Sequence, residues 1–404
     1  MKKEKVNNTP LEEDEIIGAE EYAALPTEEQ NKWMKLDPKY ERIPLWSKIA
    51  LGILPLSAII YLVICLSPVF ADFFNKNISG IFRFLLAQIT NIFPFSLAES
   101  AIILIPVILF LTIRYVWIYR CNNKKQTVVT IVCVLSIASI FISGFVWIFS
   151  AGYRGSELEE KLGIESVPID KQDLYDSAIY LTGEINKLSP EIQYDTESFS
   201  VMPYSMSEMN DKLLDAYEKF SKEHDFINTF HSKLKPVILS EGMSYAHITG
   251  VYTFFTGESN LNVGFPDYTI PFTAAHELAH QRGIAREDEA NMMAFLVCIN
   301  SDDVYIRYCA YVNMYEYVAN ALYSADKELF RKADSTLSRQ VYSEQVAYSK
   351  FFKKYQKSVT SQISGAVNDI YLQSQGTAGR KSYGMVVDLT VAYFKEEGHI
   401  EKNN

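Results

Sequence analysis

The chain has 404 residues and carries a formal net charge of −11 at pH 7, with a sequence pI near 5.2. An acidic chain is poorly suited to bind phosphate backbones, so we expect no nucleic-acid partner. Apolar residues make up 48% of the chain and charged residues 22%. This balance is typical of a protein that lies partly in a membrane and partly in water.

Residues 1–44 are polar and rich in acidic side chains. Such a composition predicts a mostly disordered tail. The first apolar run begins only near Leu45, so this stretch does not match the pattern of a cleavable signal peptide.

Three apolar runs follow, and each approaches the roughly 20 residues that a membrane-spanning helix requires. They cover residues 49–69, 101–119 and 128–149. We therefore expect a membrane domain over residues 45–150, with the lipid bilayer as its partner.

A further apolar stretch at about 78–95 lies between the first two runs. Polar residues interrupt it at Arg83, Gln88 and Asn91, so we interpret it as an interfacial helix. A fourth span is the alternative, and it would reverse the topology of everything that follows.

Basic residues cluster before the first span and between the second and third, and basic loops face the cytoplasm. An odd number of spans then places residues 151–404 outside. We expect a multi-pass protein of the cell membrane with a cytoplasmic N-terminus and an extracytoplasmic domain. The basic residues are Lys35, Lys39, Arg42, Lys48, Arg114, Arg120, Lys124 and Lys125.

The outer domain is mainly α by its apolar periodicity. Helices are predicted over 170–188, 209–230, 303–323 and 326–356. Cys298 and Cys309 fall within this domain, where a disulfide and two free buried thiols are both consistent with the sequence.

One region of the outer domain resembles β-structure. Residues 250–257 are β-branched and aromatic, and after a turn at Gly257 the pattern continues over 259–263. We expect a small hairpin whose edge strand could bind a substrate backbone, with Glu258 and Asn260 as possible contacts. The alternative is a hairpin that only supports the helix after it.

That helix contains His-Glu-x-x-His, formed by His276, Glu277 and His280. Residues four apart share one face of a helix, so both imidazoles can bind one Zn²⁺. Glu277 can take the proton from the water that attacks a carbonyl. Thr273 is a plausible N-cap, and Gly283 is a natural stop.

A catalytic zinc site needs a third protein ligand. The position six residues after His280, where one variant of the motif has histidine, holds Arg286. The acidic residues just beyond it, Glu287 and Glu289, are the candidates. We favour Glu287, because Asn291 lies four residues later on the same face and could support a ligand by hydrogen bonding.

The runs 276–283 (HELAHQRG) and 287–291 (EDEAN) resemble the gluzincin class of zinc metallopeptidases, although the gap between the second histidine and the glutamate is shorter here. Together with 147–154 (WIFSAGYR) and 382–389 (SYGMVVDL), they also resemble a bacterial family of membrane proteins known only as a domain of unknown function. The resemblance implies a membrane-anchored metalloprotease with a zincin-like domain. It assigns zinc roles to His276, Glu277, His280 and Glu287.

A peptidase also needs a donor for the oxyanion. Tyr383 and Arg380, in an irregular stretch near the C-terminus, could supply it, and a loop with a packed tyrosine is the alternative. We expect a zinc-dependent peptidase that cuts a protein or peptide outside the membrane. The alternative is a non-catalytic sensor or scaffold with a structural zinc site.

Overall fold

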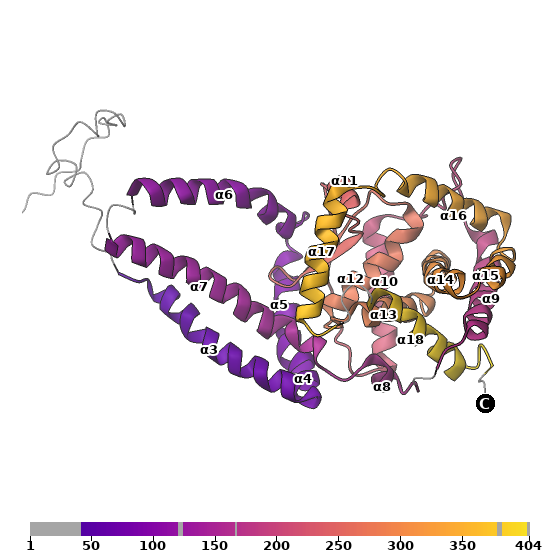
Figure 1. Cartoon of the computed structure of the whole chain (residues 1–404), viewed down its shortest axis with the longest axis horizontal. Coiled ribbons are helices and arrows are strands. Elements are labelled where there is room, and N and C mark those ends of the chain that lie inside the picture. The colour runs from indigo at the N-terminus through magenta and orange to yellow at the C-terminus, as the bar shows by residue number, and fades with distance from the viewer. Residues whose placement is uncertain (1–41, 120–123, 166–167, 378–381, 402–404) are drawn as a thin grey trace, which may run out of the picture. The chain divides into compact units, whose positions relative to one another are not determined.

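The computed structural model describes residues 42–119, 124–165, 168–377 and 382–401. It is 71% helical and has little strand, so the expected mainly α class is confirmed. The predicted tail lies almost wholly outside the described residues. Figure 1 shows three long helices from the N-terminal part of the chain and a helical domain formed by the rest.

Three helices are long and apolar enough to cross a membrane, as predicted. They are α3 (Leu45–Leu66), α6 (Leu97–Tyr119) and α7 (Lys124–Ile148), each beginning about four residues before the predicted run. Most of their large apolar side chains are exposed. In water this exposure would be costly, whereas in a bilayer it is expected.

The chain divides into two compact units, and the division does not fall at residue 150. One unit contains Met1–Leu51 and Val107–Ala138, and the other contains Gly52–Pro106 and Ser139–Asn404. The second unit therefore includes one end of each apolar helix as well as the helical domain.

Between α3 and α6 the chain forms α4 (Pro68–Phe74), a π-helical turn (Asn75–Ser79) and α5 (Gly80–Thr90). These three elements form one unbroken helical run over residues 68–90, which is not among the helices that are long and apolar enough to cross a membrane, and the interfacial interpretation stays a prediction. Arg83 on α5 is fully buried and donates to the side chain and carbonyl of Asn75 and to the carbonyl of Ile148. These bonds fix the π-helical turn to the end of α7.

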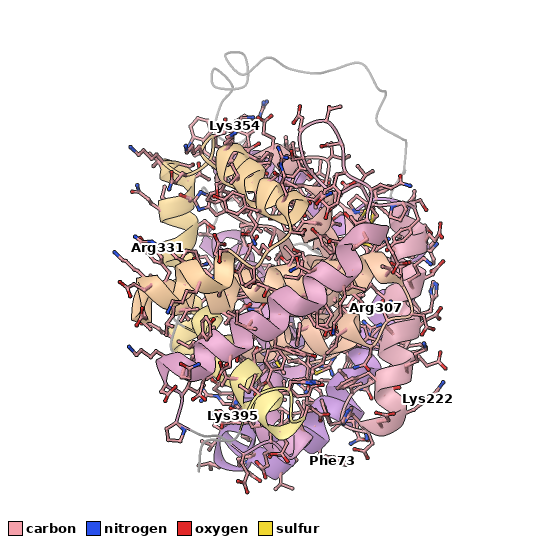
Figure 2. All side chains as sticks on the ribbon, turned by 90° about the vertical axis from the view of Figure 1, so that its right-hand side faces the viewer. Phe73, Lys222, Arg307, Arg331, Lys354 and Lys395 are labelled. Carbon is pink, nitrogen blue, oxygen red and sulfur yellow. The ribbon has the colours of Figure 1, made fainter. Side chains whose placement is uncertain are left out.

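The helical domain surrounds a central pair, α12 (Ile270–Gln281) and α13 (Glu287–Ile299), which are buried along almost their whole length. The helices that contact this pair most extensively are α10 (Met206–Glu223), α14 (Val304–Ala325) and α18 (Ser382–Glu396). Charged side chains such as Lys222, Arg331 and Lys354 reach outward around the domain (Figure 2). The remaining helices are α8 (Leu158–Leu162), α9 (Lys171–Leu188), α11 (Ser240–Tyr245), α15 (Lys327–Asp334), α16 (Arg339–Phe352) and α17 (Val359–Ser374).

Two helix predictions need correction. The run predicted over 326–356 is two helices, because Ser338 caps a new helix by accepting a hydrogen bond from the amide of Val341. The helix predicted over 209–230 ends at Glu223. The question about the cysteines is also answered: Cys298 and Cys309 are buried free thiols.

The sheet has three short strands in the order β1-β3-β2. β2 (Gly250–Thr253) and β3 (Glu258–Leu261) form the predicted antiparallel hairpin, and β1 (Lys235–Pro236) adds a parallel pairing to β3 that the sequence did not reveal. β2 is therefore an edge strand, and the sheet packs on α12.

Candidate metal centre

The helix α12 presents His276 and His280 on one face, with ring centroids 4.5 Å apart. It begins at Ile270 rather than after Thr273, because Pro271 suits the first turn of a helix. The expected N-cap at Thr273 is wrong, and that residue lies inside the helix. The hydroxyl of Tyr217 donates to the carbonyl of Ala275, which holds the helix against α10.

The end of α12 sets the orientation of His280. Gly283 adopts a φ of +99°, and the amides of Gly283 and Ile284 donate to the carbonyls of His280 and Ala279, which closes the helix in a Schellman turn. This turn places the carbonyl of Ile284 at 2.8 Å from Nδ1 of His280. With Nδ1–H donating to that carbonyl, Nε2 is left as the free lone pair for a metal.

Glu287 is the first residue of α13 and faces both histidines. Its Oε2 lies 3.2 Å from Nε2 of His276 and 3.5 Å from Nε2 of His280. Ligand atoms of the three residues all lie within 4.8 Å of one another, so they could hold a metal ion. Among the described residues no fourth histidine, cysteine or carboxylate joins this group.

Glu289, the alternative ligand, points elsewhere. Its carboxylate accepts hydrogen bonds from the amide of Leu158 and from Arg286, each at 3.0 Å. Burial raises the pKa of Glu289 to about 7, although Arg286 acts against this. The structure therefore brings Glu287, and not Glu289, to the two histidines.

The three candidate ligands form a largely buried cluster. Burial alone would lower the pKa of His280, but the Glu287 carboxylate outweighs it and raises that pKa to about 9. Burial likewise opposes ionisation of Glu287, and the two histidines overcome it and hold its pKa well below the ordinary value. A carboxylate held ionised beside two imidazoles provides the hard and borderline donors that Zn²⁺ accepts.

Glu277 lies between this cluster and the edge strand. The backbone amide of Tyr252 hydrogen-bonds its carboxylate, and the α-carbon of Gly250 lies so close that an added Cβ would be 2.5 Å from Oε1. Its Oε2 is buried with no hydrogen-bond partner. Burial raises the pKa of Glu277, with the two histidines acting in the opposite direction.

Three aromatic residues, none of them predicted as a site residue, form a chain of contacts that ends at His280. The ring of Phe149, just after α7, lies edge-on to His280 at 6.0 Å. Tyr371 on α17 lies 3.1 Å from Tyr153, hydroxyl to hydroxyl. Desolvation raises the pKa of Tyr371 to about 12, and the nearby charge of Glu287 adds to the effect. Tyr153 lies in the stretch 147–154 that carries the family resemblance, whereas no local signal marks Tyr371.

The two residues predicted to contact a substrate, Glu258 and Asn260, form hydrogen bonds within the protein instead. Glu258 is buried on β3, and its carboxylate accepts from the amides of Leu97 and Ala98 at the start of α6. Asn260 is also buried and accepts from Ser96. Both side chains therefore anchor the first turn of an apolar helix to the sheet, and the expectation that they contact a substrate is not supported.

The other predicted residues are placed as follows. Asn291 is buried within α13, and its Nδ2 has no hydrogen-bond partner. It lies close to Tyr317, whose pKa burial raises. Tyr383 belongs to α18, but its side chain lies outside the described residues, as does Arg380.

Three observations fit a bound Zn²⁺. The donor set is two imidazoles and one carboxylate. The second ring nitrogen of His280 is held by a backbone carbonyl. Oε2 of Glu277 is buried and has no hydrogen-bond partner. Buried polar atoms without partners are rare in folded proteins, so the one on Glu277 fits a site that a further group completes.

The family model described as "Protein of unknown function (DUF3810)" matches residues 70–391. This range contains the candidate metal centre, the hairpin, α5 and two of the three apolar helices. No curated protein and no solved structure matches the chain significantly.

Proposed function

Starting from the fact that the chain belongs to the DUF3810 family, we propose that it is a membrane-anchored, zinc-dependent metallopeptidase. The observation that carries the proposal is the cluster of His276, His280 and Glu287 with the carboxylate of Glu277 beside it. Three protein ligands and a neighbouring carboxylate make an open, hydrolytic site, whereas structural zinc sites are closed by a fourth protein ligand.

When bound, Zn²⁺ supplies a Lewis acid that polarises the scissile carbonyl and makes water acidic enough to react near neutral pH. Glu277 takes a proton from the attacking water at its unpartnered Oε2. Its pKa, raised by burial, suits a group that must accept that proton and then pass it to the leaving amine. The amide of Tyr252 orients the carboxylate for both transfers.

Tyr371 is the donor that we assign to the developing oxyanion. Its hydroxyl lies against Tyr153 and within electrostatic reach of Glu287. The raised pKa of Tyr371 keeps the phenol protonated, so it can donate a hydrogen bond when negative charge appears on the substrate oxygen. Tyr371 takes the role that the sequence suggested for Tyr383 or Arg380.

The domain lies outside the cytoplasm in this proposal. Arg42, Lys48, Arg114 and Lys125 lie at the start of α3, the end of α6 and the start of α7, whereas the metal centre follows the opposite end of α7. Basic ends face the cytoplasm, so three spans place the centre on the other side. A reporter fused after residue 404 that is active only outside the cytoplasm would support this topology.

The decisive experiment uses the full chain, purified in detergent, with the Glu277→Gln variant. We expect about one zinc per chain by elemental analysis in both proteins, with cleavage of a fluorogenic peptide library by the unaltered protein alone. A folded protein without zinc would overturn the proposal. Equal behaviour of the two proteins, with zinc bound and no cleavage, would favour a structural zinc site in a sensor or scaffold.

A further inference from the structure

The outer edge of β2 faces the metal centre. The amide of Asn262 donates to the carbonyl of Thr249, and hydrogen-bonded pairs alternate along an antiparallel ladder. Gly250 and Tyr252 therefore direct their backbone groups away from β3. The amide of Tyr252 already reaches Glu277 at this edge. An extended polypeptide that pairs with this edge would pass directly beside the catalytic carboxylate.

From that point β2 runs along α7. Tyr252 contacts Phe149 with ring centroids 5.3 Å apart, Phe254 contacts Phe145 at 5.5 Å, and Phe255 contacts Phe141 at 5.7 Å. As the residue number increases along the hairpin, the number of the contacted residue near or on α7 decreases, so the two segments run antiparallel. The eight residues from Phe149 to Phe141 rise about 12 Å along a helix, which is close to the length of the strand and its turn.

The helix α7 is a candidate membrane span over Lys125–Ile148. Phe149 follows the span directly, whereas Phe141 lies two turns inside it. One end of β2 is therefore at the metal centre, and the turn after it is at the level of the apolar span. Phe255 in that turn is 38% exposed, as expected for a ring that meets lipid.

A second apolar surface belongs to the helix α17. The helix α17, drawn in yellow in Figure 1, contacts Phe145 and Tyr153 through Tyr371. Its exposed face carries four apolar residues at helical spacing: Val359, Ile363, Val367 and Ile370, each more than 60% exposed. A helix with such a face is suited to lie on a membrane surface.

We infer that the substrate is a membrane-anchored polypeptide, cut just outside the bilayer as its chain leaves the membrane along β2. This inference rests on the proposed peptidase activity. A chain that leaves the bilayer beside α7 would pair with the outer edge of β2 and present the peptide bond next to Glu277. A soluble peptide would reach the same edge without the positioning that the bilayer supplies.

The test uses the full chain co-assembled into lipid nanodiscs, whose two faces are both accessible. The most rapidly cleaved peptide from the library is placed directly next to a 20-residue Leu/Ala membrane segment. A matched control carries a 20-residue Gly/Ser spacer between the two, so that anchoring and local concentration are equal. We expect the direct fusion to be cut roughly 10-fold faster, within about six residues of the segment, because β2 is only about 13 Å long.

A variant supplies an independent readout. Phe255→Asp places a charge in the turn that meets lipid, and we expect it to slow cleavage of the direct fusion several-fold. Tyr342→Asp, at an exposed position on α16, is the matched control and should leave the rate unchanged. Zinc content and thermal midpoint confirm that both variants are folded.

Two failures remain distinguishable. Equal cleavage of the direct and spaced fusions, with cuts far from the membrane segment, would overturn the inference and leave the peptidase intact. Absence of cleavage of every peptide by a zinc-loaded protein would overturn the proposed function itself.

Discussion

The carbonyl oxygen of Ile284 accepts a hydrogen bond from Nδ1 of His280 at 2.8 Å, across the turn that ends α12. The bond depends on the left-handed conformation of Gly283, which turns the chain back over the last helical residues. Backbone geometry thus determines which nitrogen of His280 can bind a metal.

Replacing Gly283 with alanine tests this dependence. A Cβ there would lie 2.5 Å from Nη2 of Arg83 and 2.7 Å from Oδ1 of Asn75, in addition to the cost of a positive φ, which is on the order of 1 kcal/mol. We expect Gly283→Ala to lower both the thermal midpoint and the zinc affinity. Gly163→Ala is the control, since that residue has a φ of +70° but nothing within 4 Å. Equal zinc affinity in the two variants would refute the role of the turn.

Gly250→Ala should separate metal binding from catalysis. The added methyl group would lie 2.5 Å from Oε1 of Glu277 and would displace the carboxylate without touching a ligand. We expect about one zinc per chain, while the turnover rate for a cleaved peptide should drop by roughly 10-fold or more. Gly242→Ala, with nothing within 4 Å, should keep full activity. Loss of zinc from Gly250→Ala would contradict this assignment.

Replacing the two candidate glutamate ligands on α13 should have different effects, one on zinc binding and the other on stability. Glu287→Ala removes a predicted ligand, so elemental analysis should find little zinc. Glu289→Ala leaves the amide of Leu158 unpaired and removes one of several partners of Arg286, which costs about 1–3 kcal/mol of stability, while zinc remains. The reverse pattern of zinc content would show that the ligand assignment is wrong.

Tyr371→Phe tests the oxyanion donor. The ring and its packing against Phe145 stay, and only the hydroxyl is lost. We expect zinc content and KM to be unchanged and the turnover rate to drop by about 10²-fold, the usual effect of removing one such donor. Tyr342→Phe, whose ring is exposed on α16, provides the control. A turnover rate equal to that of the unaltered protein would exclude Tyr371 from the reaction.

Glu316 provides a pH test at a residue that is not a candidate metal ligand. Burial raises its pKa to about 7, against an ordinary value of 4.5, and its carboxyl accepts from the hydroxyl of Tyr268. The folded state then binds this proton more tightly than the unfolded state, so the stability that the group contributes falls as pH rises from about 4.5 to 7. Glu316→Gln keeps the acceptor and removes the charge.

We therefore expect Glu316→Gln to stabilise the protein at pH 8 by on the order of 1 kcal/mol and to have less effect at pH 5. Thermal unfolding in detergent at the two pH values measures the difference. Glu165→Gln, at an exposed position, should show no such dependence. Equal effects of Glu316→Gln at both pH values would contradict the raised pKa.

Local patterns in the sequence were sufficient for the three long apolar helices and for part of the site. Runs of about 20 apolar residues identified α3, α6 and α7, because the thickness of a bilayer sets a length that residue type alone can reveal. The spacing of His276 and His280 fixed their shared face, because one helical turn brings residues four apart together. Gly283 marked the end of α12 for the same local reason.

Other features depended on contacts between distant parts of the chain. The choice between Glu287 and Glu289 follows from how α13 packs on α12, and the roles of Glu258 and Asn260 follow from the α6 start that they bind. Tyr371 meets Tyr153 although 218 residues separate them in the chain. By itself, the sequence determined features that depend on a short stretch of chain, such as the three apolar helices and the shared face of the two histidines. Only the tertiary structure decided which side chains meet. Such contacts depend on how helices pack that are far apart in the sequence, and no local sequence pattern indicates that packing.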